Sequence, residues 1–238
     1  MLTTVTITGA DDRTDPAALV ALSKEYPFIE WGLLLSVSRL GTPRYPSRAW
    51  LTEFELVARE TKAMRYAVHF CGQCTRDTLE GKTTWLDDID PGRIQLNGFE
   101  PTATFIEMAK RLLPARPTLS FILQARSTLQ LAFSITTARQ IGGATSVLYD
   151  PSGGTGQAPE RWPTFVGLPY GTAGGVGYAG GIGPANVESV LKTLHEPPDR
   201  GNFWIDMESR VRSDDNRLDL ARVRSVLEVA ARCMKVAA

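Results

Sequence analysis

The chain has 238 residues, of which 43% are hydrophobic and 22% are charged, as expected for a globular protein that buries a core of its own. Its 26 basic and 26 acidic residues balance, so the formal net charge is zero. No basic stripe marks the sequence. This excludes the basic surface typical of nucleic-acid-binding domains, and we expect no nucleic-acid partner.

In the first half of the chain, strands are predicted at residues 4–8, 28–35, 65–70 and 93–97, and helices at 15–26 and about 47–62. Asp15 is the expected N-cap of the first helix, with Pro16 at its first position, and Ser47 opens the second. The polar run that follows residue 70 is predicted as loop. Residues 82–90 supply only a short helix.

In the second half, helices are predicted at residues 101–113, about 128–140, from Pro184 onward and at 218–234, and strands at 118–124, 146–150, 175–181 and 202–207. The stretch after residue 150 is irregular because Pro159, Pro163 and Pro169 break any long helix. About eight strand–helix units predict an α/β fold, a closed (β/α)8 TIM barrel, as a single domain over residues 1–238. The alternative is an open doubly wound sheet, which normally needs fewer units.

The N-terminal stretch MLTTVTITGADD has neither the basic region nor the long apolar run of a signal peptide. No apolar run reaches the roughly 18 residues that a membrane span requires. Three cysteines, Cys71, Cys74 and Cys233, are an unsuitable number for a secreted disulfide framework. We therefore expect a cytoplasmic protein with no membrane partner.

The active site of such a barrel lies at the C-terminal ends of its strands. Polar residues dominate the positions at or just after the predicted strand ends: Thr8, Ser36, His69, Cys71, Asn97, Gln124, Arg126, Asp150, Asp206 and Glu208. In YAGGIGPANV, Gly180 and Gly181 end a strand, and Gly183 precedes a helix. Free N–H groups at a helix N-terminus favour phosphate binding, although a tight turn also needs glycine.

The stretch VLYDPSGGTG, residues 147–156, ends a strand at Asp150 and continues as a glycine-rich loop. Such a loop can close over a substrate, with Asp150 as an acid at its root. The alternative is that Asp150 only caps a turn before Pro151. Likewise, Arg44 either clamps an anionic group or is a solvated loop residue.

The spacing C-x-x-C at Cys71 and Cys74 matches redox and metal motifs, but it lies in a run predicted as loop. The chain has only two histidines, His69 and His195, and His195 is predicted to lie in a helix-to-strand connection. We therefore expect no metal and no cofactor. No strand ends on a lysine, which weakens a Schiff-base aldolase interpretation. His69, near the predicted rim, is either a general base or a polar rim residue.

Several segments resemble, in order, the motifs of phosphoribosylanthranilate isomerase, a barrel enzyme of tryptophan biosynthesis. VTITGADD is similar to its K-I-C-G-I-T, IQLNGFEP to V-Q-L-H-G-x-E, VLYDPSGGTG to L-L-D-x…G-G-[ST]-G, and YAGGIGPANV to L-[AS]-G-G-L-x-P-x-N-V. GLLLSVSRLGTPRYPS and WIDMESRV resemble its second-strand loop and its V-D-V-S-S-G-V. The resemblance implies a barrel of the ribulose-phosphate-binding type, with Asp150 as general acid and Arg44 as anion clamp.

The departures from the family lie at functional positions. Thr8 stands where the family has its general-base cysteine, and Asn97 replaces a histidine. Glu208, Ser209 and Arg210 replace the small phosphate-binding turn S-S-G. A threonine hydroxyl is no base near neutral pH. We therefore predict a divergent relative that does not carry out the standard isomerase reaction.

The expected function is that of an isomerase-type acid–base enzyme acting on a small phosphorylated or anionic metabolite. Asp150 is the principal catalytic candidate, and Asp11, His69 and Cys71 are candidates for the missing base. Expected substrate-binding residues are Thr8, Arg44, Asn97, Gln124, Asp206, Glu208 and Arg210, and expected phosphate-binding residues are Gly154, Gly156, Gly180, Gly181 and Gly183. The alternatives are a catalytically inactive ligand-binding or regulatory barrel and a lyase that uses Asp206 and Glu208. We expect a monomer or homodimer.

Overall fold

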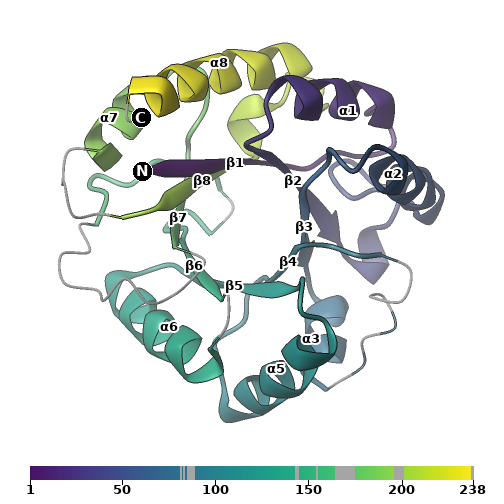
Figure 1. Ribbon diagram of the computed structural model, residues 1–238, viewed down its shortest axis with the longest axis vertical. Helices are drawn as coiled ribbons and strands as arrows, with labels where there is room; N and C mark the ends of the chain where they lie inside the picture. The colour runs from purple at the N-terminus through teal and green to yellow at the C-terminus, as the bar shows by residue number, and fades with distance from the viewer. Residues whose placement is uncertain are drawn as a thin grey trace.

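A computed structural model of the protein describes residues 1–80, 82, 84, 89–142, 145–153, 155–163, 175–195 and 201–236. Its eight parallel strands pair in sequence order, and β8 pairs with β1, so the barrel is closed (Figure 1). The strands are β1 (Leu2–Thr8), β2 (Ile29–Leu35), β3 (Tyr66–Phe70), β4 (Arg93–Leu96), β5 (Ser120–Ala125), β6 (Ser146–Tyr149), β7 (Val176–Ala179) and β8 (Phe203–Met207). The predicted barrel is confirmed, and the open-sheet alternative is wrong.

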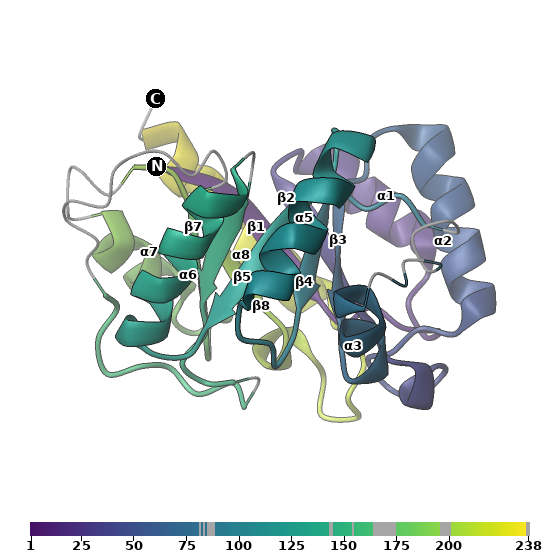
Figure 2. The ribbon, with the colours of Figure 1, turned by 90° about the horizontal axis from the view of Figure 1, so that it is seen from below.

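The helices form a ring outside the strands, as Figures 1 and 2 show from two directions. They are α1 (Pro16–Glu25), α2 (Arg48–Thr61), α3 (Gln73–Leu79), α5 (Ala103–Ala115), α6 (Thr128–Ile141), α7 (Val187–His195) and α8 (Leu220–Val236), with 3₁₀ turns at Val37–Arg39 and Ser209–Val211. The expected caps are confirmed: Asp15 accepts a hydrogen bond from the N–H of Ala17, and Ser47 accepts one from the N–H of Trp50.

Two predictions about local structure are wrong. The polar run after residue 70 is not all loop, because Gly72, at φ 60°, turns the chain into the short helix α3. That helix buries Cys74, Thr75 and Thr78, so it lacks the apolar stripe that sequence periodicity detects. His195 is the last residue of α7 rather than part of a connection. Most of residues 82–90, and Pro169, lie outside the described residues.

The main core lies between the strands and the surrounding helices, where strand β2 is buried along its whole length. A second, smaller cluster consists of Ala67, Ile122, Leu148, Ala179 and Trp204. The indole of Trp204 packs so closely on Gly177 that a Cβ there would lie 2.2 Å from it. The Arg93 guanidinium lies 4.4 Å from the centroid of the Trp204 ring and pairs with buried Glu30. These contacts fill the barrel around Trp204.

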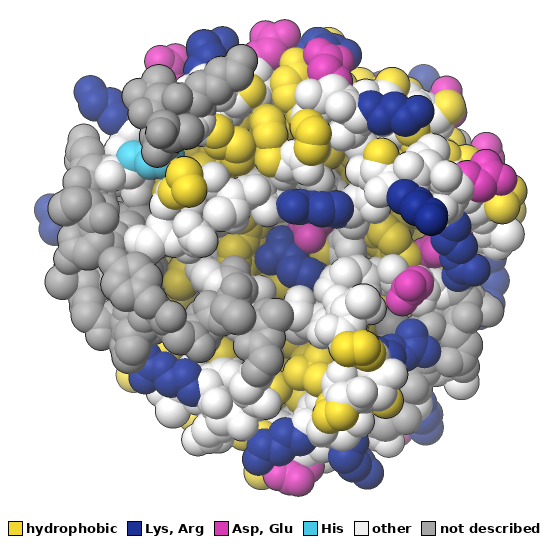
Figure 3. Space-filling model, viewed as in Figure 1, with side chains coloured by type: hydrophobic (Ala, Val, Ile, Leu, Met, Phe, Trp, Pro, Cys, Tyr) yellow, Lys and Arg dark blue, Asp and Glu magenta, His cyan; other side chains and the backbone are white. Residues whose placement is uncertain are grey.

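The described part of the chain contains no helix that is long and apolar enough to cross a membrane. The face drawn in Figure 3 carries basic, acidic and hydrophobic side chains side by side, in keeping with the balanced composition.

Candidate active site

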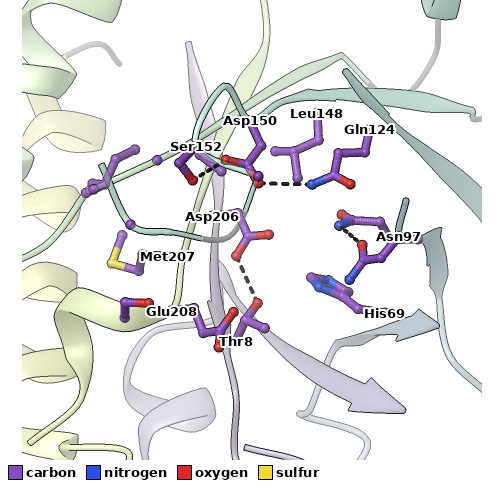
Figure 4. Close-up of a pocket in the computed structure, with 18 of the residues that line it drawn as sticks. Thr8, His69, Asn97, Gln124, Leu148, Asp150, Ser152, Asp206, Met207 and Glu208 are labelled. Carbon is purple, nitrogen blue, oxygen red and sulfur yellow. Dashed lines mark hydrogen bonds between the residues drawn. The ribbon is translucent and has the colours of Figure 1, made fainter. Parts of the chain in front are cut away.

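A cavity opens at the C-terminal ends of the strands, where the sequence predicts the active site (Figure 4). Most of the polar residues expected there line it: Thr8, His69, Asn97, Gln124, Asp150, Asp206, Glu208 and Arg210, together with Gly156, Gly180 and Gly181. Asp11, Arg44, Cys71 and Gly183 do not line it, and Gly154 lies outside the described residues. Gln95 and Ser152 line it without having been expected.

Asp150 follows the end of β6 and is held by two side-chain donors. Its Oδ2 accepts a hydrogen bond from Gln124 Nε2 at 2.9 Å, and its Oδ1 accepts one from Ser152 Oγ at 2.6 Å. The backbone also turns here, since the N–H of Gly153 donates to the carbonyl of Asp150. Asp150 therefore belongs to a turn and also presents a carboxyl group to the cavity. Gln124 of β5 and Ser152 of the loop after β6 fix the orientation of this carboxyl group.

Asp206 belongs to β8 and is only 7% exposed. Burial raises its pKa to about 8, and the negative charges of Asp150, Glu208 and Glu30 add to this rise, while a hydrogen bond from Thr8 opposes it. Thr8 Oγ1 donates to Asp206 Oδ1 at 2.9 Å. Gly32 of β2 makes room for Thr8, because a Cβ there would lie 2.2 Å from Thr8 Oγ1. Asp206 is therefore mainly a neutral carboxylic acid at pH 7.

His69 and Asn97 lie across the cavity from Asp206 (Figure 4), and Gln95 also lines the cavity. Burial lowers the pKa of His69 to about 4, so its imidazole is neutral at pH 7. Gln95 Nε2 donates to Asn97 Oδ1 at 2.6 Å, and Asn97 Nδ2 donates to Cys71 Sγ at 3.3 Å. Burial raises the pKa of Cys71, which keeps it a thiol. Cys71 thus orients Asn97 through this hydrogen bond without lining the cavity itself.

Asp11 lies in a separate network. It is buried, and its Oδ2 lies 3.0 Å from Arg212 Nη2 and 2.7 Å from the backbone nitrogen of Arg44. Burial alone would raise the pKa of Asp11, but donors from Arg44, Arg13 and Arg212 together hold it below its usual value. Of the three candidates for the missing base, only His69 lines the cavity.

Arg44 pairs with Glu208 beside the cavity. Arg44 Nη1 lies 2.6 Å from Glu208 Oε1, and Arg44 Nε donates to Asn216 Oδ1 at 3.1 Å. Burial raises the pKa of Glu208, while the charge of Arg44 opposes the rise. The ion pair with Glu208 thus neutralises Arg44, the residue expected to clamp an anion.

The glycines after β7 are required by close packing. A Cβ on Gly181, at φ 62°, would lie 2.5 Å from the nitrogen of Ala158, and one on Gly183 would lie 2.4 Å from Arg210 Cβ. The N–H of Gly183 already donates to Asn186 Oδ1 at 2.9 Å. Close backbone approach therefore explains why glycine occupies positions 181 and 183, and phosphate binding by this loop stays a prediction.

Two arginines at the cavity, Arg126 and Arg210, are exposed, and neither has an ion-pair partner among the described residues. They are the cations available to an anionic ligand.

Gln95 was detectable in the sequence, because alternate residues of a strand share a face and Asn97 was already placed at the rim. The described ranges contain no group of three or more His, Cys, Asp or Glu side chains that could hold a metal ion.

No protein-family model matches the chain, and neither does any curated protein. Solved structures do match it. Phosphoribosylanthranilate isomerase from Thermotoga maritima is 16% identical, with a TM-score of 0.64, over 96% of this chain and 98% of that one. The enzyme from Thermus thermophilus is 19% identical, with a TM-score of 0.58 and the same coverage. TrpF from Jonesia denitrificans is 17% identical, with a TM-score of 0.64, over 98% of each chain.

These likenesses confirm the resemblance to phosphoribosylanthranilate isomerases at the level of the fold. A phospho-2-dehydro-3-deoxyheptonate aldolase from Thermotoga maritima and a GH18 chitinase from Pseudoalteromonas aurantia also match, each with a TM-score of 0.53. One fold hosts many reactions, so the reaction has to be argued from the residues of the cavity.

Proposed function

We propose that the protein is an acid–base enzyme of the isomerase type that acts on a small anionic or phosphorylated metabolite, by a reaction other than that of phosphoribosylanthranilate isomerase. One observation carries this proposal: two carboxyl groups, Asp150 and Asp206, face one cavity in different surroundings. Pairs of titratable groups whose environments differ in this way supply the acid and the base of many enzymes.

Asp206 is the proton donor in this proposal. Its Oδ1 accepts the hydrogen bond from Thr8, so the acidic proton resides on Oδ2, which faces the cavity (Figure 4). Asp150, oriented by Gln124 and Ser152, is the base. An isomerisation next to a carbonyl group moves a carbon-bound proton to Asp150 while Asp206 Oδ2 protonates the carbonyl oxygen. Thr8 then acts as a positioning residue for Asp206.

The anionic group of the substrate is held at the rim. Arg210, in the loop after β8, lines the cavity together with Gly180 and Gly181, which follow β7. An exposed arginine beside backbone N–H groups is a common way to bind phosphate or carboxylate. Glu208 does not repel this group strongly, because Arg44 neutralises its charge.

Solvent exchange tests the proposal whatever the product of the reaction is. The protein is incubated in D₂O with a panel of aldose and ketose phosphates, and carbon-bound deuterium is measured by mass spectrometry. We expect incorporation with at least one compound, its loss in Asp150→Asn and Asp206→Asn, and its retention in Asp214→Asn, an exposed carboxylate outside the cavity. Conversion of phosphoribosylanthranilate at ordinary enzyme rates, roughly 1–10³ per second, contradicts the proposed change of reaction.

A second candidate function is a binding barrel without chemistry. It is favoured by Thr8, which replaces the related base, and by Glu208, which occupies Arg44. Tight binding of a panel compound with no deuterium incorporation would support this candidate.

A further inference from the structure

The cavity has a wall of neutral polar groups that the proposed acid–base pair does not use. His69 of β3 and Gln95 of β4 lie directly opposite each other in the parallel register, and both side chains line the cavity. They are 2% and 3% exposed. Figure 4 shows the ring of His69 across the cavity from Asp206.

Each of these two residues has a buried polar atom without a hydrogen-bond partner in the described part of the chain. The atoms are His69 Nε2 and Gln95 Oε1. Buried polar atoms are nearly always paired, because an unpaired one has given up its bonds to water and gained none in return. Two such atoms on neighbouring strands of one cavity indicate a position that a ligand group completes.

A chain of hydrogen bonds determines which end of the Gln95 amide is unpaired. The Cys71 thiol donates to the carbonyl of His69, which leaves its sulfur to accept from Asn97 Nδ2. Asn97 therefore turns its Oδ1 toward Gln95 and accepts from Gln95 Nε2. The remaining oxygen, Gln95 Oε1, is thus an acceptor that needs a donor.

The missing group must donate to Gln95 Oε1 and also satisfy His69 Nε2. A carboxylate or phosphate oxygen has no proton to donate, so it does not fit beside Gln95 Oε1. The neutral imidazole of His69 adds no positive charge that would attract an anion. A hydroxyl group fits both atoms with the tautomer of His69 that carries its proton on Nε2, because the hydroxyl then accepts a hydrogen bond from Nε2 and donates its own proton to Gln95 Oε1.

We propose that His69 and Gln95 form a hydroxyl-binding subsite, which recognises a hydroxyl of the ligand at the opposite side of the cavity from its anionic group. The ligand class that this selects is a polyhydroxylated phosphate or carboxylate rather than an alkyl one. The inference rests on the proposed function only for the anionic group, and binding tests it without any turnover.

The probes are D-ribose 5-phosphate, pentyl phosphate and 5-aminopentyl phosphate, three five-carbon phosphates that differ in hydrogen-bonding groups. Their dissociation constants are measured by calorimetry for the wild type, His69→Phe and Gln95→Met. We expect the wild type to bind ribose 5-phosphate at least tenfold more tightly than pentyl phosphate, and each variant to reduce this ratio to near one. His195→Phe, which changes the histidine outside the cavity, leaves the ratio unchanged.

Circular dichroism and the melting temperature show whether each variant is folded, and two independent variants keep the test valid if one of them unfolds. Equal binding of the first two probes, failure to bind ribose 5-phosphate, or a ratio that both variants preserve overturns the subsite. Preference for 5-aminopentyl phosphate overturns the hydroxyl assignment. If the wild type shows the hydroxyl selectivity but incorporates no deuterium into any compound of the panel, only the proposed acid–base function is contradicted.

Discussion

Thr8 Oγ1 donates a hydrogen bond to Asp206 Oδ1 across 2.9 Å and so joins the first strand of the barrel to the last at the cavity. Thr8 stands where the resemblance to phosphoribosylanthranilate isomerases implies a general-base cysteine. Because a threonine hydroxyl is not a base, the role that we propose for Thr8 is to orient the neighbouring Asp206. In the proposed mechanism, acid–base chemistry therefore depends on Asp206 and Asp150 rather than on residue 8.

Asp206 makes the folded protein less stable at high pH. The unfolded chain loses this proton near pH 3.8, whereas the folded protein keeps it until about pH 8. Between these values the folded state binds one more proton, so the free energy of unfolding falls by about 1.4 kcal/mol per pH unit as pH rises. Urea unfolding of wild type and Asp206→Asn from pH 4 to 8 measures this slope as their difference. Parallel curves would contradict the protonation of Asp206.

His69 has the opposite effect. Burial holds its pKa at about 4, against 6.5 for the unfolded chain, so the unfolded state binds the extra proton in this window. Its contribution to stability is complete above pH 6.5 and is lost as pH falls toward 4, by about 1.4 kcal/mol per pH unit. We expect His69→Phe to lack this loss in the same urea titration. If the free energy of unfolding of the variant still falls as pH drops from 6.5 to 4, a group other than His69 causes this loss.

The buried ion pair between Asp11 and Arg212 holds the loops after β1 and β8 together. Removing one partner leaves a buried charge, so Arg212→Met is expected to lower the free energy of unfolding by about 3–5 kcal/mol. Arg217→Met is the control, because its pair with Asp215 is exposed on both sides. Chemical denaturation that shows equal, small losses for the two variants would contradict a structural role for the pair.

Gly181 tests the packing of the loop that follows β7. A Cβ there would lie 2.5 Å from the nitrogen of Ala158, and φ is 62°. Gly98 has a similar φ of 71° but no atom within 4 Å of the added Cβ, so Gly98→Ala carries the backbone strain alone. We expect Gly181→Ala to lower the melting temperature by several degrees more than Gly98→Ala. Equal effects would mean that the loop carrying Ala158 moves away from the added Cβ at little cost in stability.

The barrel could be predicted because buried parallel strands form apolar runs, and because Asp15 and Ser47 mark helix starts. The same strand ends located Asp150 and Asp206. The pairing of Asp11 with Arg212 was not predictable, because the two residues are 201 positions apart and meet only when the barrel closes. Helix α3 was missed because threonine and cysteine side chains form its buried face.

The proposed acid–base pair requires Asp206 to be a neutral carboxylic acid at pH 7, and NMR measures its protonation state directly. The carboxyl carbons of aspartate are labelled with carbon-13 and titrated by NMR from pH 3 to 9, with Asp206→Asn providing the assignment. We expect one carboxyl carbon that titrates near pH 8 and is missing in the variant. If every aspartate is ionised by pH 6, the cavity has no neutral carboxylic acid at pH 7, and Asp206 is not the proton donor.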